Sequence, residues 1–369
     1  MKKILISGYY GFGNSGDDAL LLSIIRGLKE KIPDCAITVL SANPGETAAL
    51  YGVDAVDRWN IFKIIKSAAR SDLLVSGGGT LIQDGTSTKS LVYYLAVIMT
   101  AYIFRTKIML YSNGIGPLGK KGNIRITRNI LNKADLITLR DEASEKTLAE
   151  IGVTKPKIEL TADPAFLLEA DTGGRSAELI AKCRGGKSEF FIISIRRWRT
   201  LSEDFAGVIA EAADHTAERY GMTPVFLPMQ LSADGDISRE AAAKMKSRPV
   251  MLDERMTTGE TLAVIERAKL CIGMRLHTLI YAASRGVPVT GLVYDPKING
   301  FMDYIGQNMY TDVSGVKKEK LIGMIDECML DYDEIKRRID GRVCELRIKA
   351  EKNSDYAARL LEGGPENGK

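Results

Sequence analysis

The sequence predicts an α/β protein with two Rossmann-like, doubly wound domains that face a cleft, followed by C-terminal helices. Short, continuously apolar runs alternate with helix-length stretches, as expected for parallel strands that are buried on both faces. These runs fall into two series, which a polar, glycine-containing segment at 169–189 separates. A chain of 369 residues is also long enough for two domains, each with its own core.

The first domain is predicted over 1–170 and the second over 185–330. The strand runs of the first are KILIS (3–7), AITVL (36–40), DLLVS (72–76), KIMLYS (107–112), LITL (136–139) and KIEL (157–160). Those of the second are FFIISI (190–195), PVFLP (224–228), PVML (249–252), LCIG (270–273) and PVTGLVY (288–294). The charged, amphipathic stretch at 331–369 predicts terminal helices and a loose tail, GPENGK.

Composition excludes several classes of protein. A net charge of +4 with no aromatic-and-basic repeat gives no reason to expect a nucleic-acid partner. Five scattered cysteines without a CxxC pair argue against a disulfide framework, and two histidines argue against a zinc site, so no metal is assigned. The basic start leads directly into a strand, so we expect no signal peptide and a cytoplasmic protein.

Cations follow the strands of the second domain where each strand ends. In open α/β sheets, ligands meet the carboxyl ends of the strands. The residues at these ends are Arg196 and Arg197, Gln230, Arg275 with Leu276 and His277, and Lys297. Together with the N–H groups that begin the helix after Arg275, they predict a site for a phosphate and a carboxylate. The alternative for each residue alone is a helix cap or a surface group.

In the first domain, Gly11, Gly13 and Gly16 match the Gly-x-Gly-x-x-Gly sequence pattern of dinucleotide-binding domains. The second strand lacks the acidic residue that holds ribose, and Asp17 and Asp18 would repel a pyrophosphate, so we reject a nicotinamide cofactor. Asn14 and Asp17 can instead bind sugar hydroxyls, or Asp17 can cap the helix at a tight turn.

Three further strand ends offer acceptor-binding residues. They carry Gly78 within a run of three glycines, Asn113 and Arg140. The glycines let a ligand or another backbone approach closely.

The window from Gly85 to Ala134 contains no Asp or Glu. It includes LVYYLAVIMTAYIF (91–104), which is too short to span a bilayer, since a spanning helix needs about 20 residues. One interpretation is a buried core helix. The other is a surface that touches anionic lipid, because basic residues lie beside an apolar face.

These motifs resemble the polysaccharide pyruvyl transferase family, and most closely its bacterial CsaB type, which acts in cell-wall polymer synthesis. The segments that carry the resemblance are SGYYGFGNSGDDALL, SGGGTLIQD, SNGIGPL, LRDEAS, ADPAF, SIRRW, PMQ and GMRLHTLIYAASRGVPVTGLVYDPK. They span almost the whole chain. The Arg-Leu-His element, with Lys297 twenty residues later, is the most specific part.

The resemblance implies a GT-B-like fold and phosphoenolpyruvate as donor substrate, with no separate cofactor. For the CsaB type it implies a lipid-linked saccharide that bears N-acetylmannosamine, and hence an anionic membrane surface on the inner face as a candidate partner. The first domain would bind the acceptor and the second the donor. The implied catalytic residues are His277, as acid–base group, with Arg275 and Arg196. Whether Arg196 or Arg197 is the family arginine stays open.

Two rival functions remain. One is a nucleotide-sugar glycosyltransferase of the same fold, although the second domain shows no acidic ribose clamp. The other is a non-catalytic, membrane-peripheral saccharide-binding protein, for which His277 would be dispensable.

Overall fold

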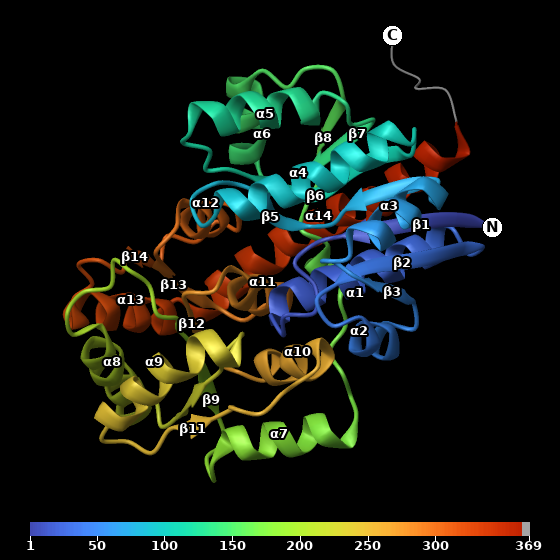
Figure 1. Cartoon of the computed structure of the whole chain (residues 1–369). Helices are drawn as coiled ribbons and strands as arrows, with labels where there is room; N and C mark the ends of the chain where they lie inside the picture. Colours follow the sequence, from blue (N-terminus) through green and yellow to red (C-terminus); the bar gives the residue numbers. More distant parts are fainter. Residues whose placement is uncertain (364–369) are drawn as a thin grey trace. The chain divides into compact units, whose positions relative to one another are not determined.

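The computed structural model describes residues 1–363, and the predicted loose tail lies outside this range (Figure 1). The chain divides into two compact units. Unit 1 is Met1–Leu167 together with the described chain from Leu346 onward, and unit 2 is Leu168–Glu345.

Unit 1 is built on a sheet in which every strand pairing is parallel, in the order β3-β2-β1-β4-β6-β7-β8, with β5 paired to β6. The strands are β1 Lys2–Ser7, β2 Cys35–Ser41, β3 Asp54–Asp57, β4 Leu73–Ser76, β5 Gly79–Ile82, β6 Lys107–Ile115, β7 Leu136–Leu139 and β8 Lys157–Leu160. The chain order reverses between β1 and β4. In open α/β sheets this reversal places a crevice at the carboxyl ends of the strands.

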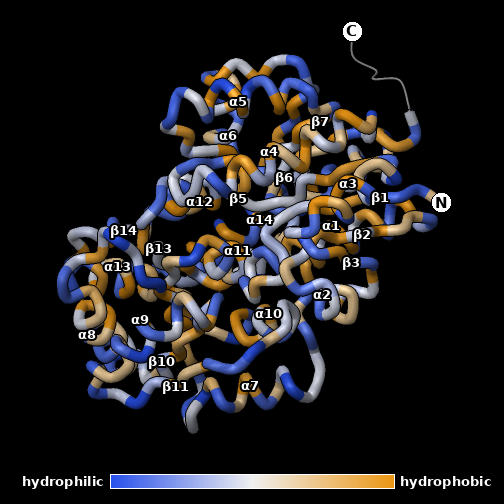
Figure 2. Tube along the Cα trace, viewed as in Figure 1, coloured by the Kyte–Doolittle hydropathy of each residue, from blue (hydrophilic) through white to orange (hydrophobic). Residues whose placement is uncertain are grey.

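Helices cover both faces of this sheet because alternate strand residues point to opposite sides. Ile4 and Ile6 pack with α1 (Ser15–Lys31) and the end of α14 (Tyr332–Glu362), whereas Leu5 packs on the side of the other helices. These are α3 Ile61–Arg70, α4 Thr88–Ile103, α5 Lys121–Leu131 and α6 Glu142–Ile151, while α2 Pro44–Tyr51 follows β2. Figure 2 shows hydrophobic stretches running through the strands and helices of this unit, α4 among them.

Unit 2 is also built on a parallel sheet, with the strand order β11-β10-β9-β12-β13-β14. The strands are β9 Phe190–Ser194, β10 Thr223–Phe226, β11 Val250–Met251, β12 Cys271–Gly273, β13 Val289–Val293 and β14 Tyr310–Asp312. The helices are α7 Gly174–Arg184, α8 Phe205–Arg219, α9 Leu231–Lys244, α10 Thr258–Glu266, α11 Leu276–Ser284, α12 Pro296–Tyr304 and α13 Lys318–Leu330. Here the order reverses between β9 and β12.

The two doubly wound parallel sheets confirm the predicted fold class, and every apolar run named above overlaps a strand. Three strands were missed: β3, β5 and β14. They are short and carry polar residues, so they lack the continuous apolar character of the others.

The terminal helix α14 begins in unit 2 and ends in unit 1. Asn353 ties its second half to the first sheet, because its side-chain oxygen accepts hydrogen bonds from Thr138 at 2.6 Å and Thr161 at 2.9 Å.

Candidate functional site

The carboxyl ends of β9, β12 and β13 lie side by side in unit 2. In the strand register Ser194 lies opposite Gly273, and Gly273 lies opposite Gly291. The chain therefore brings Arg196 and Arg275 to neighbouring strand ends, since each lies two residues beyond the Ser194–Gly273 pair. This is also where the strand order reverses, which is the ligand position typical of open α/β sheets.

Arg275 is held in place by a buried carboxylate. Its Nε lies 3.1 and 3.0 Å from the two carboxylate oxygens of Asp234, and its Nη2 lies 2.5 Å from Oδ1. Asp234 is fully buried in the first turn of α9, and the side chain of Arg275 is 11% exposed. Nη2 also donates to Gln230 Oε1 at 3.4 Å. None of the hydrogen bonds within the described chain uses Nη1, so this nitrogen is available to an anion.

Arg196 and Arg197 have different surroundings, although they are adjacent in sequence. The Arg196 guanidinium lies 4.9 Å from the ring centroid of Trp198 and 5.4 Å from that of Tyr294, and its Nη1 donates to the Tyr294 hydroxyl at 3.4 Å. It forms no ion pair with any described residue. Arg197 is exposed and pairs with Glu240 at 2.6 Å. Arg196 is therefore the cation at this strand end whose charge no carboxylate offsets.

The segment after Arg275 begins helix α11. Strand β12 and helix α11 pack closely against each other. This packing requires Gly273, because a Cβ there would lie 2.6 Å from the side chain of Leu279. His277 lies half-buried in the first turn, with its ring centroid 6.2 Å from that of Tyr281. The side chain of Leu276 is buried, so this residue can offer a ligand only its backbone N–H. No side chain in the described part of the chain caps this helix, whose first N–H groups favour an anion.

Lys297 lies in the first turn of α12, near the same aromatic residue as Arg196. Its Nζ is 5.7 Å from the ring centroid of Tyr294 and 3.4 Å from Asp295 Oδ2. Tyr294 and Trp198 pack edge to face, with centroids 4.7 Å apart. The structure thus places Arg196 and Lys297 against one aromatic residue, and Arg275 beside Gln230.

In unit 1 the cap of α1 is Asn14. Its Oδ1 accepts the N–H of Gly16 at 3.2 Å, so the expectation that Asp17 caps this helix is wrong. Asp17 lies one turn further on, and a Cβ on Gly79 would lie 3.5 Å from its Oδ1. At Gly78 a Cβ would lie 3.0 Å from Leu20, so the close approach of α1 accounts for this glycine.

Arg140 and Asn113 lie at the ends of neighbouring strands and are both buried. Arg140 donates to Asp163 at 3.2 Å and to Thr80 at 2.8 Å. A Cβ on Gly114 would lie 3.0 Å from the Arg140 guanidinium. The Asn113 amide donates to the Ser76 carbonyl at 3.0 Å, while its Oδ1 is buried with no hydrogen-bond partner in the described chain. That oxygen can accept a hydrogen bond from a hydroxyl that enters this end of the sheet.

The polar residues that sequence reasoning missed are Asp234, Tyr294, Trp198, Thr80 and Asp163. All of them except Asp234 lie in motifs already noted, so a signal for them was present: Trp198 in SIRRW, Asp163 in ADPAF, Thr80 in SGGGTLIQD and Tyr294 in the segment that ends in VYDPK. Asp234 lies 41 residues from Arg275, and no spacing rule pairs them.

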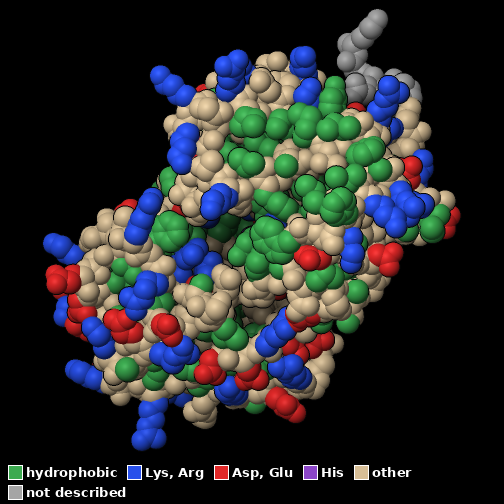
Figure 3. Space-filling view, in the orientation of Figure 1, with side chains coloured by type: hydrophobic (Ala, Val, Ile, Leu, Met, Phe, Trp, Pro, Cys, Tyr) green, Lys and Arg blue, Asp and Glu red, His purple; other side chains and the backbone are tan. Residues whose placement is uncertain are grey.

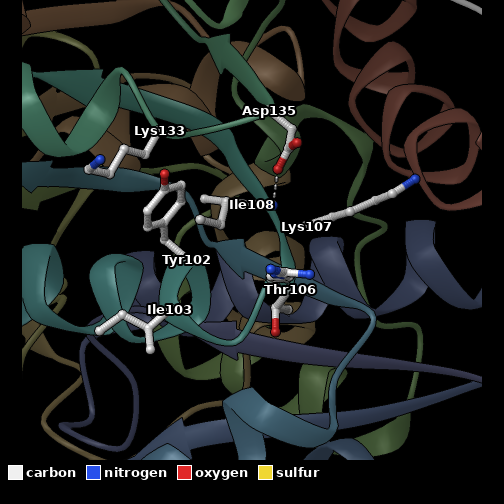
Figure 4. Close-up of a pocket in the computed structure, with 8 residues that line it drawn as sticks. Tyr102, Ile103, Thr106, Lys107, Ile108, Lys133 and Asp135 are labelled. Carbon is white, nitrogen blue, oxygen red and sulfur yellow. Dashed lines mark hydrogen bonds between the residues drawn. The ribbon is translucent and has the colours of Figure 1, made fainter.

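A shallow cavity of about 450 Å³ lies elsewhere in unit 1 (Figure 4). It is lined by Tyr102, Ile103, Arg105, Thr106, Lys107, Ile108, Lys133 and Asp135. Lys133 Nζ lies 4.2 Å from the ring centroid of Tyr102, and Asp135 accepts the N–H of Ile108 at 2.7 Å. Because Lys107 begins β6, this cavity lies at the amino ends of the strands, away from Asn113.

Comparison with solved structures shows the GT-B fold. A putative UDP-N-acetylglucosamine 2-epimerase from Listeria monocytogenes matches with a TM-score of 0.69 and 12% identity, over 99% of this chain and 98% of that one. Anabaena Alr3699/HepE, solved with UDP and glucose, matches with a TM-score of 0.66 and 14% identity, over 99% of this chain and all of that one. Identities this low show the fold alone.

The sequence comparisons identify the family. The amylovoran biosynthesis protein AmsJ of Erwinia amylovora is 21% identical over 414 residues, which cover 95% of this chain and 97% of AmsJ. The family model for polysaccharide pyruvyl transferase matches residues 14–296, from the cap of α1 to the start of α12. The chain therefore belongs to the polysaccharide pyruvyl transferase family.

Proposed function

We propose that the protein is a ketal-forming pyruvyl transferase of the CsaB type. It would transfer pyruvate from phosphoenolpyruvate to an N-acetylhexosamine, namely the N-acetylmannosamine of a lipid-linked cell-wall polymer precursor. Family membership supports the transferase class, and AmsJ, a relative named for amylovoran biosynthesis, supports a role in polysaccharide synthesis. The observation that carries the donor assignment is the set of cations at the ends of β9, β12 and β13.

The donor brings a phosphate and a carboxylate, so it needs at least two cations. Arg275 offers Nη1 while Asp234 fixes the rest of its guanidinium. Arg196 offers a charge that no carboxylate neutralises, and the N–H of Leu276 adds a backbone donor at the start of α11. Lys297 and Gln230 complete the proposed donor set. We choose Arg196 over Arg197 because Arg197 is already paired with Glu240.

In the proposed reaction, a proton adds to C3 of phosphoenolpyruvate and C2 becomes oxocarbenium-like. One sugar hydroxyl attacks C2 and loses its proton, and the C2–O bond breaks so that phosphate leaves with the bonding electron pair. A second hydroxyl then closes the ketal ring and gives its proton to the departing phosphate. His277 is the proposed proton carrier, since an unperturbed imidazole titrates near neutral pH. Arg275 and Arg196 would stabilise the charge on the departing phosphate. We assign no cofactor and no metal to these steps.

The proposed acceptor site is the carboxyl edge of the sheet in unit 1. Asn113 offers a buried carbonyl oxygen, and Arg140 holds the neighbouring strand end together through Thr80 and Asp163. Asn14 and Asp17 belong to the same edge, at the start of α1. Gly78 keeps the backbone there close to α1.

The proposal places the protein in the cytoplasm, on the inner face of the membrane. Within the described residues, no helix combines the length and the hydrophobicity needed to cross a bilayer. Docking on the membrane surface is the proposed route to the acceptor, because a lipid-linked saccharide keeps its sugar close to the bilayer.

Calorimetric titration with phosphoenolpyruvate, and separately with uridine and guanosine nucleotides, tests the donor. Phosphoenolpyruvate should bind, and Arg275→Ala should remove most of this binding. Tight binding of a nucleotide without phosphoenolpyruvate binding would favour the rival glycosyltransferase. Binding of neither, with His277 dispensable in cells, would favour a saccharide-binding protein.

A further inference from the structure

An exposed apolar surface covers the beginning of α3. Trp59 is 66% exposed, Ile61 62%, Phe62 81% and Ile65 37%. On the adjacent α4, Val92 is 45% exposed. Figure 3 shows hydrophobic side chains grouped over the part of unit 1 where Figure 1 draws α3 and α4, with Lys and Arg side chains along the border. Monomeric proteins rarely leave so many large apolar side chains together in water unless the surface binds something.

The charged side chains of α3 itself have one sign. Between Arg58 and Ser71 the sequence contains no Asp or Glu, while Lys63, Lys66 and Arg70 are all exposed. Helix α4 belongs to the acid-free window 85–134. A second copy docked about a twofold axis would place these lysines against each other, which like charges oppose. Trp, Phe and Ile interleaved with Lys are instead typical of a helix that lies in the headgroup region of an anionic bilayer.

The surface is linked to the candidate acceptor site through Arg58, which is 3% exposed. Its guanidinium lies 5.1 Å from the ring centroid of Trp59 and 4.5 Å from that of Tyr93. On the other side it lies 5.1 Å from Phe12, and its Nη1 donates to the Gly8 carbonyl at 2.9 Å. Gly8 and Phe12 belong to the loop that leads to Asn14. The aromatic rings and the carbonyl group that surround Arg58 therefore connect the exposed apolar surface to that loop.

Helix α4 itself supports this choice of surface. Leu91, Leu95 and Ile98 are buried in the core of unit 1, so this face of α4 is not available to lipid. Its partner α3 presents Ile61, Phe62 and Ile65 outward while Ile64 and Ala68 pack inward.

We propose that this α3 face, defined as Trp59, Ile61, Phe62, Lys63, Ile65 and Lys66, docks the protein on anionic lipid bilayers. Docking would hold the loop 8–14 close to the headgroup plane. The identity of the substrate presented there rests on the proposed function, but the docking itself does not.

The test uses the full chain and vesicles of phosphatidylglycerol and phosphatidylcholine, with phosphatidylcholine vesicles for comparison. In Trp198→Phe, Trp59 is the only tryptophan. Its fluorescence should shift to the blue on anionic vesicles and be quenched by brominated lipid. Ile61→Ser, Phe62→Ser and Ile65→Ser together should lower the vesicle affinity measured by co-sedimentation about a thousandfold, since each buried apolar side chain contributes about tenfold. Lys63→Gln with Lys66→Gln should weaken binding by roughly fivefold per lysine at low salt, and less at high salt.

Matched controls lie elsewhere on the chain. Leu330→Ser and Ile348→Ser remove exposed apolar side chains, and Lys317→Gln with Lys320→Gln remove exposed charges. These variants should bind vesicles as the wild type does, and thermal unfolding should show that all variants are folded. If the wild-type protein does not bind anionic vesicles, or if brominated lipid does not quench the fluorescence of Trp59, the proposal is wrong. It is also wrong if the triple serine variant changes only the oligomeric state in sedimentation velocity, because a second copy would then cover the face.

No donor or acceptor is present in these assays. Failure to bind vesicles therefore leaves the proposed reaction intact, and failure of ketal transfer leaves the docking result intact.

Discussion

Replacing Arg275 by lysine keeps the positive charge but removes the three-nitrogen guanidinium group. The substitution therefore tests whether the donor needs a guanidinium nitrogen or only a positive charge at this position. In the wild type, Nε and Nη2 hold Asp234 and Nη1 remains for the donor. A lysine has one charged nitrogen, and the fully buried Asp234 carboxylate will hold it. The donor then loses a charge-assisted hydrogen bond in a partly dry site. Such a loss costs about 2–5 kcal/mol, which corresponds to an affinity lower by about 30-fold to roughly 5,000-fold.

Calorimetric titration of Arg275→Lys with phosphoenolpyruvate measures this loss, with thermal unfolding as a check on the fold. The control is Arg239→Lys on α9, where the arginine forms an exposed pair with Asp236. The control should bind the donor as the wild type does, because exposed pairs contribute little. Equal donor affinity in Arg275→Lys and wild type would refute the assignment of this guanidinium to the donor.

Further perturbations also have defined outcomes. His277→Gln should keep donor binding but lower turnover roughly 10²–10⁴-fold, whereas the control His215→Gln should retain activity. Neither the wild-type activity nor that of His215→Gln should depend on added metal or be lost on adding a chelator. Burial acts to raise the pKa of Asp326, but hydrogen bonds from Tyr220 and His215 outweigh it and lower this pKa. The carboxylate therefore stabilises the fold at neutral pH and loses this effect as the pH falls through the lowered pKa, so in urea titrations Asp326→Asn should approach wild-type stability only in acid. Asn353→Leu should reduce the free energy of unfolding by about 1–3 kcal/mol, because Thr138 and Thr161 lose an acceptor.

Much of the fold was predictable because the strands of a parallel sheet are apolar on both faces. The run at 190–195 shows this, since Phe190–Ser194 is buried throughout. Strand β3, Asp54–Asp57, is only partly buried and begins and ends with Asp, so the same signal is absent. The return of α14 to unit 1 depends on Asn353, whose partners lie 192 and 215 residues earlier. Local patterns do not report contacts at that separation.

The candidate site was predictable to the level of strand ends. The rule that ligands meet the carboxyl ends of strands selected Arg196, Arg275 and His277 before any geometry was known. It could not choose between Arg196 and Arg197, because that choice depends on Glu240 and on the packing of Tyr294. It also overlooked the α3 face, although the acid-free segment with Trp59 and Phe62 is visible in the sequence.

The central claim is ketal transfer from phosphoenolpyruvate. Mass spectrometry of a lipid-linked disaccharide bearing N-acetylmannosamine, incubated with the protein and phosphoenolpyruvate, measures it directly. We expect the saccharide to gain one pyruvyl ketal, with one phosphate released for each ketal formed, and we expect His277→Gln to slow both. An unchanged saccharide with wild-type protein that binds phosphoenolpyruvate, or a product that has gained a sugar from a nucleotide donor instead, would contradict the claim.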